Sequence, residues 1–180
     1  MSKPNLKPCV TLFIPVYNGA EFLHETISSV LNQTFTDFEV LIVDDGSTDN
    51  SVQIIESFND SRIRIVSNNT NKGRPFTRNR GIDLAKGKYL AVLDADDIAE
   101  SNRLELQVNF LDKYTDIAAV GSEATIIDDK GNLGAICKVF TDNKTIHQNM
   151  YNANCFIHSS VLFRLQVMKK IGGYDASFPQ

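Results

Sequence analysis

The sequence predicts an α/β fold built around a mostly parallel sheet, and two observations carry this prediction. Short apolar runs of strand length alternate with segments in which apolar residues recur at helical spacing. Three of the apolar runs are followed by polar residues of the kind that form turns after strands. Because 180 residues with 42% hydrophobic content can bury one substantial core, we expect a single domain.

The first half of the chain follows a regular β-α-β rhythm. Strands are predicted at residues 10–15, 38–43, 63–67 and 89–93. Helices are predicted at residues 21–32, from a cap within residues 47–49 to residue 58, from a basic loop to residue 85, and at residues 103–111. Right-handed crossovers then place the four strands parallel, in the order 3-2-1-4.

The pattern changes after Asp116. Residues 118–127 and 133–140 are predicted as extended segments joined by a hairpin turn at residues 129–132. A helix at residues 141–150, a strand at 160–163 and a helix at 165–171 are expected to follow. The sheet is therefore expected to become mixed in its C-terminal part.

Bulk composition excludes several classes of partner. Eighteen basic against 22 acidic residues give a formal net charge of −4, which argues against binding to a nucleic-acid backbone. Cys9, Cys137 and Cys155 lack paired spacing, so a reducing, cytoplasmic setting is expected. Residues 2–8 are polar, and no apolar run approaches the ~20 residues needed to span a bilayer. Peripheral association with the cytoplasmic face of a membrane stays open.

Three polar clusters follow strands whose carboxyl ends meet at one edge of the predicted sheet, where such folds bind ligands. The clusters are Tyr17 and Asn18, then Asp44 and Asp45, then Asp94, Asp96 and Asp97. With strands ~4.8 Å apart, the two acidic clusters are expected roughly 10 Å from each other, which suits a nucleoside joined to a diphosphate.

So many carboxylates on one edge would repel one another and any phosphate unless a cation lay among them. Oxygen ligands beside a phosphate-bearing substrate favour Mg²⁺ or Mn²⁺, with Asp96 as the leading ligand. The basic loop at residues 72–80 adds Arg78, the best candidate to neutralise phosphates, with Arg74 and Arg80 nearby. Taken singly, such Asp residues are more often turn formers and such a basic helix start is more often a solvated face.

In combination, these residues resemble family 2 glycosyltransferases, which have the GT-A fold, a Rossmann-like three-layer sandwich. The resemblance covers nearly the whole chain. Its motifs are IPVYN at residues 14–18, SVLNQT at 29–34, VDDGSTD at 43–49, TRNRGI at 77–82, LDADD at 93–97 and GGYD at 172–175. Such motifs in register outweigh what an isolated Asp-X-Asp would indicate.

The resemblance implies a role for the residues around the nucleoside. Pro15 and Tyr17 would border it, with the Tyr17 ring against the base, and Asp45 would accept a hydrogen bond from the base. For Pro15 and Tyr17, strand termination and core packing are equally good explanations from the sequence alone.

The resemblance also implies the phosphate and metal contacts. Arg78 would face the pyrophosphate, Asp94 would lie near the ribose and the metal, and Asp96 would bind Mn²⁺ or Mg²⁺ directly. The activity implied is transfer, with inversion, of a sugar from a nucleoside-diphosphate sugar, a UDP-sugar by preference, to a saccharide or lipid-linked saccharide acceptor. Such chemistry belongs to polysaccharide and cell-envelope biosynthesis.

By the same resemblance, residues 1–116 would form a nucleotide-binding half and residues 117–180 the start of an acceptor-side half. Similar proteins place the catalytic base in an acidic pair shortly after the GGYD motif, and the sequence reaches Gln180 without such a pair. The chain is therefore expected to be truncated, with its catalytic base unknown. Asp175 is better explained as a turn or capping residue.

Three alternatives remain at this stage. A receiver domain also gathers Asp residues at strand ends, but its acidic pair is expected after the first strand, whereas Asp44 and Asp45 follow the second. A dehalogenase-like phosphatase also uses Asp-X-Asp, but after its first strand, whereas Asp94 and Asp96 follow the fourth. A non-catalytic module that binds nucleotide-sugars would carry the same motifs as an active transferase.

Overall fold

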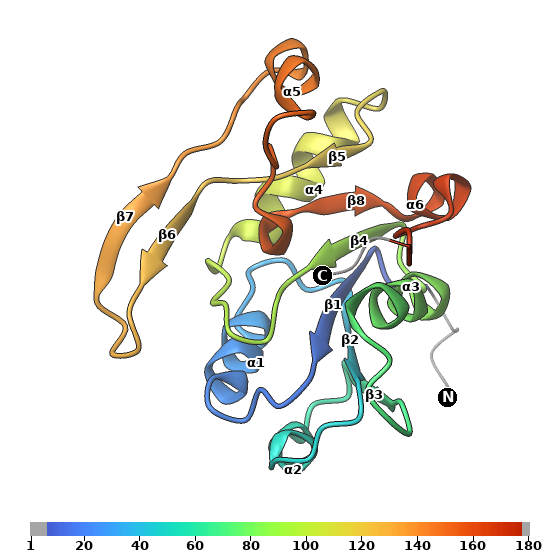
Figure 1. Ribbon diagram of the computed structural model, residues 1–180, viewed down its shortest axis with the longest axis vertical. Coiled ribbons are helices and arrows are strands. Elements are labelled where there is room, and N and C mark those ends of the chain that lie inside the picture. The colour runs from blue at the N-terminus through green and yellow to red at the C-terminus, as the bar shows by residue number, and fades with distance from the viewer. Residues whose placement is uncertain (1–6, 178–180) are drawn as a thin grey trace.

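The computed structural model describes residues 7–177, so most of the polar stretch at residues 2–8, and Gln180, lie outside the described part. A six-stranded sheet has the order β3-β2-β1-β4-β8-β5, and a separate hairpin pairs β6 with β7 (Figure 1). The strands are β1 Val10–Val16, β2 Phe38–Asp44, β3 Ile63–Ser67, β4 Tyr89–Val92, β5 Ala119–Val120, β6 Ala124–Ile127, β7 Leu133–Cys137 and β8 Leu162–Arg164.

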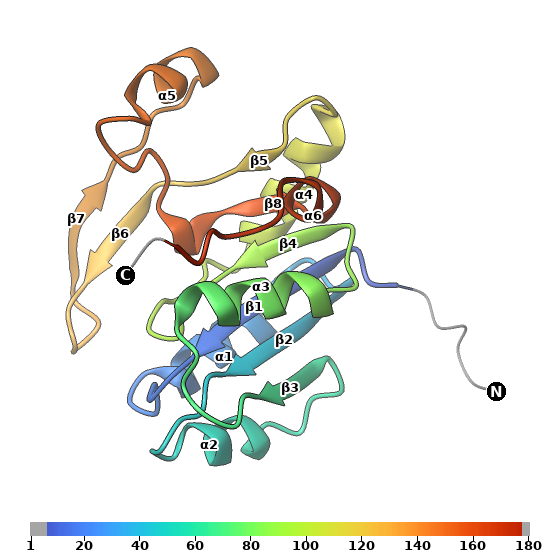
Figure 2. The ribbon, with the colours of Figure 1, turned by 45° about the vertical axis from the view of Figure 1, so that its right-hand side comes forward.

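Helices cover both faces of this sheet, which makes a three-layer sandwich (Figure 2). The helices are α1 Leu23–Leu31, α2 Ser51–Ser57, α3 Arg74–Leu84, α4 Arg103–Lys113, α5 Asn143–Asn149, α6 Leu165–Ile171 and the short 3₁₀ helix η1 His158–Ser160. Side chains of a strand alternate between faces. Accordingly, Leu12 and Ile14 of β1 pack with α1, α2 and α4, whereas Phe13 packs with α3 and α6.

The predicted strand order and directions are confirmed. β1 pairs parallel with both β2 and β4, and β2 pairs parallel with β3, so β1 lies inside the sheet and its residues Val10, Leu12 and Ile14 are fully buried. β8 then pairs antiparallel with β4 and with β5, which makes the sheet mixed as expected. The carboxyl ends of β1, β2 and β4 therefore meet at one edge.

One predicted segment is divided in the structure. Residues 118–127 are not one strand: β5 joins the main sheet, and β6 forms the hairpin with β7. The division follows from Ser160, whose Oγ accepts a hydrogen bond from Ser122 N and donates to Ser122 O. These side-chain bonds replace the β-ladder after Val120. Ser160 itself lies in η1, so β8 begins at Leu162, two residues later than predicted.

The predicted cap of α2 within residues 47–49 is wrong in detail. The N-cap is Asn50, and it makes no side-chain capping bond. Asp49 instead accepts hydrogen bonds from Ser51 N and Oγ, and from Ala20 N in the loop after β1. Asp49 thus connects the loop after β1 with the loop after β2, both at the carboxyl edge of the sheet.

Helix α3 lies unusually close to the sheet. A Cβ atom added at Gly81 would lie 2.5 Å from the Phe13 ring, so no larger residue fits there without a shift. The helix begins after Gly73, whose φ of 87° suits glycine. This close packing brings the first turns of α3 to the carboxyl ends of β1 and β4. Within residues 7–177, no helix is long and apolar enough to cross a bilayer.

Candidate functional site

A cleft of about 470 Å³ opens at the carboxyl edge of the sheet. Its wall comes from the loops after β1, β2 and β4 and from the start of α3. The lining includes all six residues predicted to bind substrate or metal: Pro15, Tyr17, Asp45, Arg78, Asp94 and Asp96. The structure therefore brings Asp45 and Asp96, which are distant in sequence, into one cleft.

The loop after β1 presents an exposed aromatic ring. Tyr17 is 49% exposed, which rules out core packing as the explanation for this residue. Next to it, Asn18 has a φ of 51°, and its Oδ1 accepts a hydrogen bond from Thr48 N at 2.8 Å. Asn18 N in turn donates to Ser47 Oγ at 2.9 Å. Pro15 lies within β1 and does not terminate it, because the strand continues to Val16.

Asp45 anchors the loop that leads into α3. Its Oδ1 accepts hydrogen bonds from Asn68 Nδ2 at 2.6 Å and from Lys72 N at 2.9 Å. Its Oδ2 accepts one from Gly73 N at 2.9 Å. The residue is only 4% exposed, so these bonds satisfy a carboxylate that burial would otherwise penalise. A carboxylate oxygen takes about two hydrogen bonds, which leaves Oδ2 able to accept one from a ligand.

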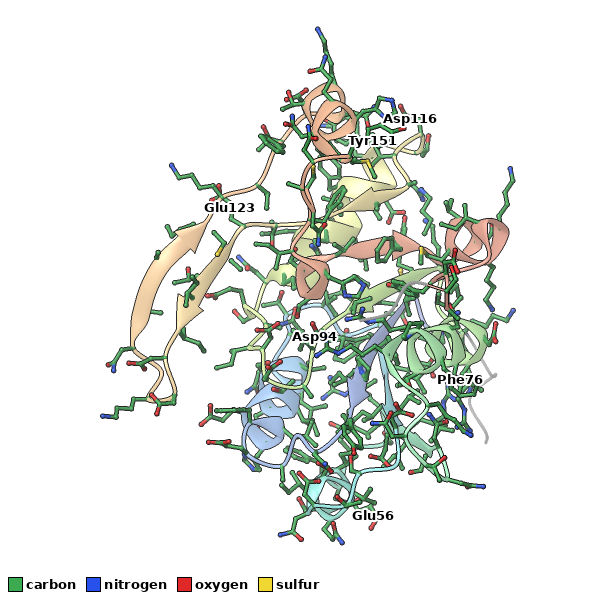
Figure 3. All side chains as sticks on the ribbon, viewed as in Figure 1. Glu56, Phe76, Asp94, Asp116, Glu123 and Tyr151 are labelled. Carbon is green, nitrogen blue, oxygen red and sulfur yellow. The ribbon has the colours of Figure 1, made fainter. Side chains whose placement is uncertain are left out.

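Arg78 lies at the inner wall of the cleft, with its side chain only 13% exposed. Its Nη2 is 3.5 Å from Asp94 Oδ1, and its guanidinium carbon lies 5.6 Å from the centre of the Tyr174 ring. Asp94 is held through its backbone, because Asp94 N donates a hydrogen bond to Ser159 Oγ at 2.9 Å. Figure 3 shows Asp94 near the middle of the molecule, beyond the end of β4.

Asp96 is exposed and lies two residues beyond Asp94 in the same loop. The pKa of Asp97 in the same loop is raised, first by desolvation of its carboxyl group. A hydrogen bond with Ser159 works against this rise, and the negative charges of Asp96 and Asp94 add to it.

Among residues 7–177, no three His, Cys, Asp or Glu side chains gather into a metal cage made by protein alone. Two carboxylates, Asp94 and Asp96, do line one cleft. This donor set fits a cation that takes one or two protein carboxylates and completes its coordination with phosphate and water, as Mg²⁺ and Mn²⁺ do.

Three charged residues near the predicted site do not line the cleft. Asp44 is buried and accepts a hydrogen bond from Ser47 N, so it forms a turn. The Arg80 guanidinium donates to Ser67 O and Asn68 Oδ1, on the far side of the Asp45 loop. Asp175 accepts from Ser177 N at 2.8 Å, which agrees with the turn expected from the sequence and holds its carboxyl pKa below the ordinary value.

Polar residues of α1 brace the loop that carries Asp94 and Asp96, a role that sequence reasoning missed. Thr26 Oγ1 donates to Ala95 O at 2.9 Å, and Ser29 Oγ accepts from Ala99 N at 3.0 Å. Gln33, two residues after the end of α1, donates to Glu100 O and accepts from Leu104 N. The available signal was the occurrence of Thr26 and Ser29 on an otherwise apolar helix face, followed by Gln33, and Thr26 and Gln33 are buried.

A second set of missed residues lies behind Arg78. His158 Nε2 and the Tyr174 hydroxyl are 2.6 Å apart. Burial, and then the positive charge of Arg78, lower the pKa of His158 to about 4, so this imidazole is neutral at pH 7. Burial raises the pKa of Tyr174 to about 12. No sequence signal singled out His158, because its partners lie far away along the chain.

The neutral state of His158 gives a testable pH dependence. The imidazole has a pKa of about 4 in the folded chain against an ordinary 6.5, so between these values the unfolded chain binds more protons than the folded one. We therefore expect the free energy of unfolding to decrease as the pH falls from 6.5 to 4. Urea denaturation across this range should show a shallower dependence for His158→Gln than for the wild type. The exposed His147→Gln should keep the wild-type slope, and equal slopes in all three would contradict the assignment.

A neighbouring cleft of about 520 Å³ shares Phe22 and Asp96 with the first. Its other wall is β6 and the turn that follows it, including Ile126 and Ile127. Acidic side chains, among them Glu25 of α1, line the cleft together with these apolar ones. The two clefts therefore meet at Asp96, so that ligands bound in each would be adjacent.

Comparison with known proteins agrees with this arrangement. The sequence profile described as "Glycosyl transferase family 2" matches residues 11–172. An uncharacterized glycosyltransferase of Methanocaldococcus jannaschii is 35% identical over 173 residues, covering 92% of this chain and 59% of that protein. An Escherichia coli UDP-Glc:alpha-D-GlcNAc-diphosphoundecaprenol beta-1,3-glucosyltransferase is 34% identical over 148 residues, covering 82% of this chain and 56% of that protein. The chain thus spans a little over half the length of these two relatives.

Solved structures share the fold. A mannosyltransferase from Pyrobaculum calidifontis, in complex with GDP-Man and Mn²⁺, superposes with a TM-score of 0.71 at 21% identity and covers 95% of this chain and 48% of its own. Residues 1–349 of TarS from S. aureus, in complex with UDP-GlcNAc, give a TM-score of 0.69 at 23% identity, over 90% of this chain and 47% of that one. Both have the GT-A fold, which confirms the predicted fold class. From the extent of the profile match, the chain belongs to glycosyl transferase family 2.

Proposed function

We propose that this chain binds a nucleoside-diphosphate sugar, with UDP as the preferred nucleotide, in the 470 Å³ cleft together with Mn²⁺ or Mg²⁺. The protein to which it belongs would transfer the sugar, with inversion, to an acceptor hydroxyl. One observation carries the proposal: an exposed aromatic ring, an arginine with only 13% of its side chain exposed, and the carboxylates of Asp45 and Asp96 from separate loops line one cleft. These groups match a base, a pyrophosphate and a cation.

The nucleoside would occupy the part of the cleft between the loops after β1 and β2. The exposed ring of Tyr17 offers a stacking surface for the base, and Pro15 borders it. Asp45 Oδ2 retains an acceptor site, which suits an N–H donor on the base. Because Asp45 also holds the loop at residues 68–73, the acceptor is fixed before the ligand arrives, and binding requires little further ordering.

The diphosphate would lie between Arg78 and the carboxylates of Asp94 and Asp96. A divalent cation, when bound, would neutralise the diphosphate and stabilise it as the leaving group. Arg78 would bind phosphate oxygens that the cation does not reach, since its planar guanidinium offers paired donors. Asp94 would then share its charge between the cation and Arg78, from which its Oδ1 is 3.5 Å away.

The neighbouring 520 Å³ cleft is suited to the acceptor, because it meets the donor cleft at Asp96. We propose that a saccharide or lipid-linked saccharide binds there, as the E. coli relative's name states for its own acceptor. Such an acceptor would place the protein in the cytoplasm, peripherally at the cytoplasmic face of a membrane, in polysaccharide biosynthesis of the cell envelope.

Among residues 7–177, we assign no catalytic base, since Asp175 is engaged in a turn. We propose that residues 1–116 supply the nucleotide half and that residues 117–180 belong to the acceptor half. The same cleft would serve a second candidate, a non-catalytic module that binds nucleotide-sugars. Family membership argues against the phosphatase and receiver-domain alternatives.

Isothermal titration calorimetry with UDP, with and without Mn²⁺, tests the proposal. We expect binding that strengthens when Mn²⁺ is added, and weaker binding of uridine, which lacks the phosphates. Absence of metal-dependent binding for UDP, and then for GDP, would overturn the donor assignment. Release of UDP from UDP-sugars on addition of saccharide acceptors would separate an active transferase from a binding module.

A further inference from the structure

The Arg78 side chain rests on a network of residues that donor binding, as proposed above, does not explain. The Tyr174 ring lies under its guanidinium, 5.6 Å from the ring centre, and the Tyr174 hydroxyl is 2.6 Å from His158 Nε2. The His158 and Tyr174 rings meet edge to face, with centroids 5.5 Å apart. Tyr174 therefore contacts both an arginine of the cleft and a buried histidine behind it.

The backbone of Tyr174 is fixed as firmly as its ring. Asn79, the residue after Arg78, accepts a hydrogen bond from Tyr174 N at 2.7 Å and donates to Tyr174 O at 2.8 Å. Gly173 precedes Tyr174 with a φ of 74°, and a Cβ atom there would clash with Asn79 Oδ1. The segment at residues 172–174 is thus clamped onto α3 beside Arg78.

Few charged or hydrogen-bonding groups hold the Arg78 guanidinium besides the Tyr174 ring. Arg78 is nearly buried, and Asp94, 3.5 Å away, is its single salt-bridge partner among residues 7–177. Arg78 Nε is buried without a hydrogen-bond partner in the same residues, so the head group is held by its surroundings and not by a hydrogen bond at Nε. If Asp94 binds a cation, the cation–π contact with the Tyr174 ring would still hold the Arg78 guanidinium. A neutral His158 adds no competing positive charge.

We propose that His158 and Tyr174 are positioning residues of the donor site, which hold Arg78 toward the place of the diphosphate. Their contact fixes the orientation of the Tyr174 ring, and the ring fixes the guanidinium. This inference rests on the proposed function, because the position of Arg78 affects donor binding only if a phosphate binds in the cleft. The contact itself can be tested without any nucleotide.

The first measurement uses the free chain. The ¹H–¹⁵N resonance of Arg78 Nε–H should exchange slowly with water in the wild type. Because this N–H makes no hydrogen bond within residues 7–177, its protection comes from burial, and loosening the Tyr174 ring should increase its exposure. His158→Leu, which removes the partner of the Tyr174 hydroxyl, and Tyr174→Phe, which keeps the ring, should each exchange roughly threefold to tenfold faster, because each loses the His158–Tyr174 hydrogen bond that holds the ring. His158→Gln should retain slow exchange, since its amide can donate to or accept from the hydroxyl. Unchanged exchange in both disruptive variants would overturn the proposal.

The second measurement is the ratio of UDP to uridine affinity in the presence of Mn²⁺. Tyr174→Phe and His158→Leu should lose UDP affinity roughly threefold to tenfold while uridine affinity stays constant, and His158→Gln should restore the ratio. Tyr151→Phe is the matched control, because Tyr151 is 92% exposed and lies beside α5, away from Asp94 (Figure 3).

The two measurements separate this inference from the proposed function. If the wild type binds neither UDP nor GDP while exchange at Arg78 responds to the variants, the proposed function fails and the positioning contact stands. If the wild type binds UDP but the disruptive variants weaken UDP and uridine equally, the role of the pair is general stability and the inference is overturned.

Discussion

Asp96→Asn is expected to remove most of the Mn²⁺-dependent part of UDP binding. The substitution keeps the shape of the side chain but takes away a negative charge that, in the proposed site, binds the cation directly. Loss even of a group that only orients a metal ligand costs roughly ten- to a hundredfold in metal affinity, so loss of a ligand should cost at least that much. Calorimetry with UDP and Mn²⁺ measures the effect, and binding of UDP without metal should change little.

Asp116→Asn is the matched control for this substitution. Asp116 is exposed and lies after α4, away from Asp94 (Figure 3). Its substitution by Asn removes the same charge from the chain as Asp96→Asn does. It should therefore bind UDP and Mn²⁺ like the wild type. Equal affinities for wild type and Asp96→Asn would show that Asp96 does not hold the cation and would leave Asp94 as the remaining candidate ligand.

Asp45→Asn is expected to have the largest effect on folding stability. The Asp45 carboxylate accepts hydrogen bonds from Asn68 Nδ2, Lys72 N and Gly73 N, and the residue is 4% exposed. An asparagine amide would turn its NH₂ group toward at least one of these donors, which removes that hydrogen bond and sets two N–H donors against each other in a buried place. Each such loss costs about 1–3 kcal/mol, so we expect the free energy of unfolding to fall by about 2–3 kcal/mol. Urea denaturation gives the value.

The neighbouring residue provides a control with the same burial. Asp44 is 3% exposed but accepts one side-chain hydrogen bond, from Ser47 N, which an asparagine oxygen can also accept. Asp44→Asn should therefore destabilise the chain by less than Asp45→Asn. Equal losses would mean that negative charge at this strand end, and not the three bonds to the loop, determines stability.

The alternation of short apolar runs with helical periodicity was sufficient to predict the sheet. Strands β1, β2 and β4 bury side chains on both faces, so their sequences are mostly apolar, and crossover handedness leaves few strand orders. The hairpin turn at residues 129–132 was predicted correctly, because turn residues there separate two extended segments. The split between β5 and β6 was not predicted, because it depends on Ser160, far along the chain, whose hydroxyl bonds the backbone of Ser122.

Within the candidate site, the sequence alone determined which loops carry its residues. Strand-ending motifs identified the six residues that now line one cleft, because in a parallel sheet all carboxyl ends share an edge. Only the tertiary structure decided which of two adjacent acids faces the cleft: Asp45 lines it, whereas Asp44 turns into its own loop. Only the tertiary structure, likewise, placed His158 and Tyr174 behind Arg78. Side-chain direction at a turn, and contacts between distant segments, depend on hydrogen bonds that form only once the chain has folded, so no local pattern records them.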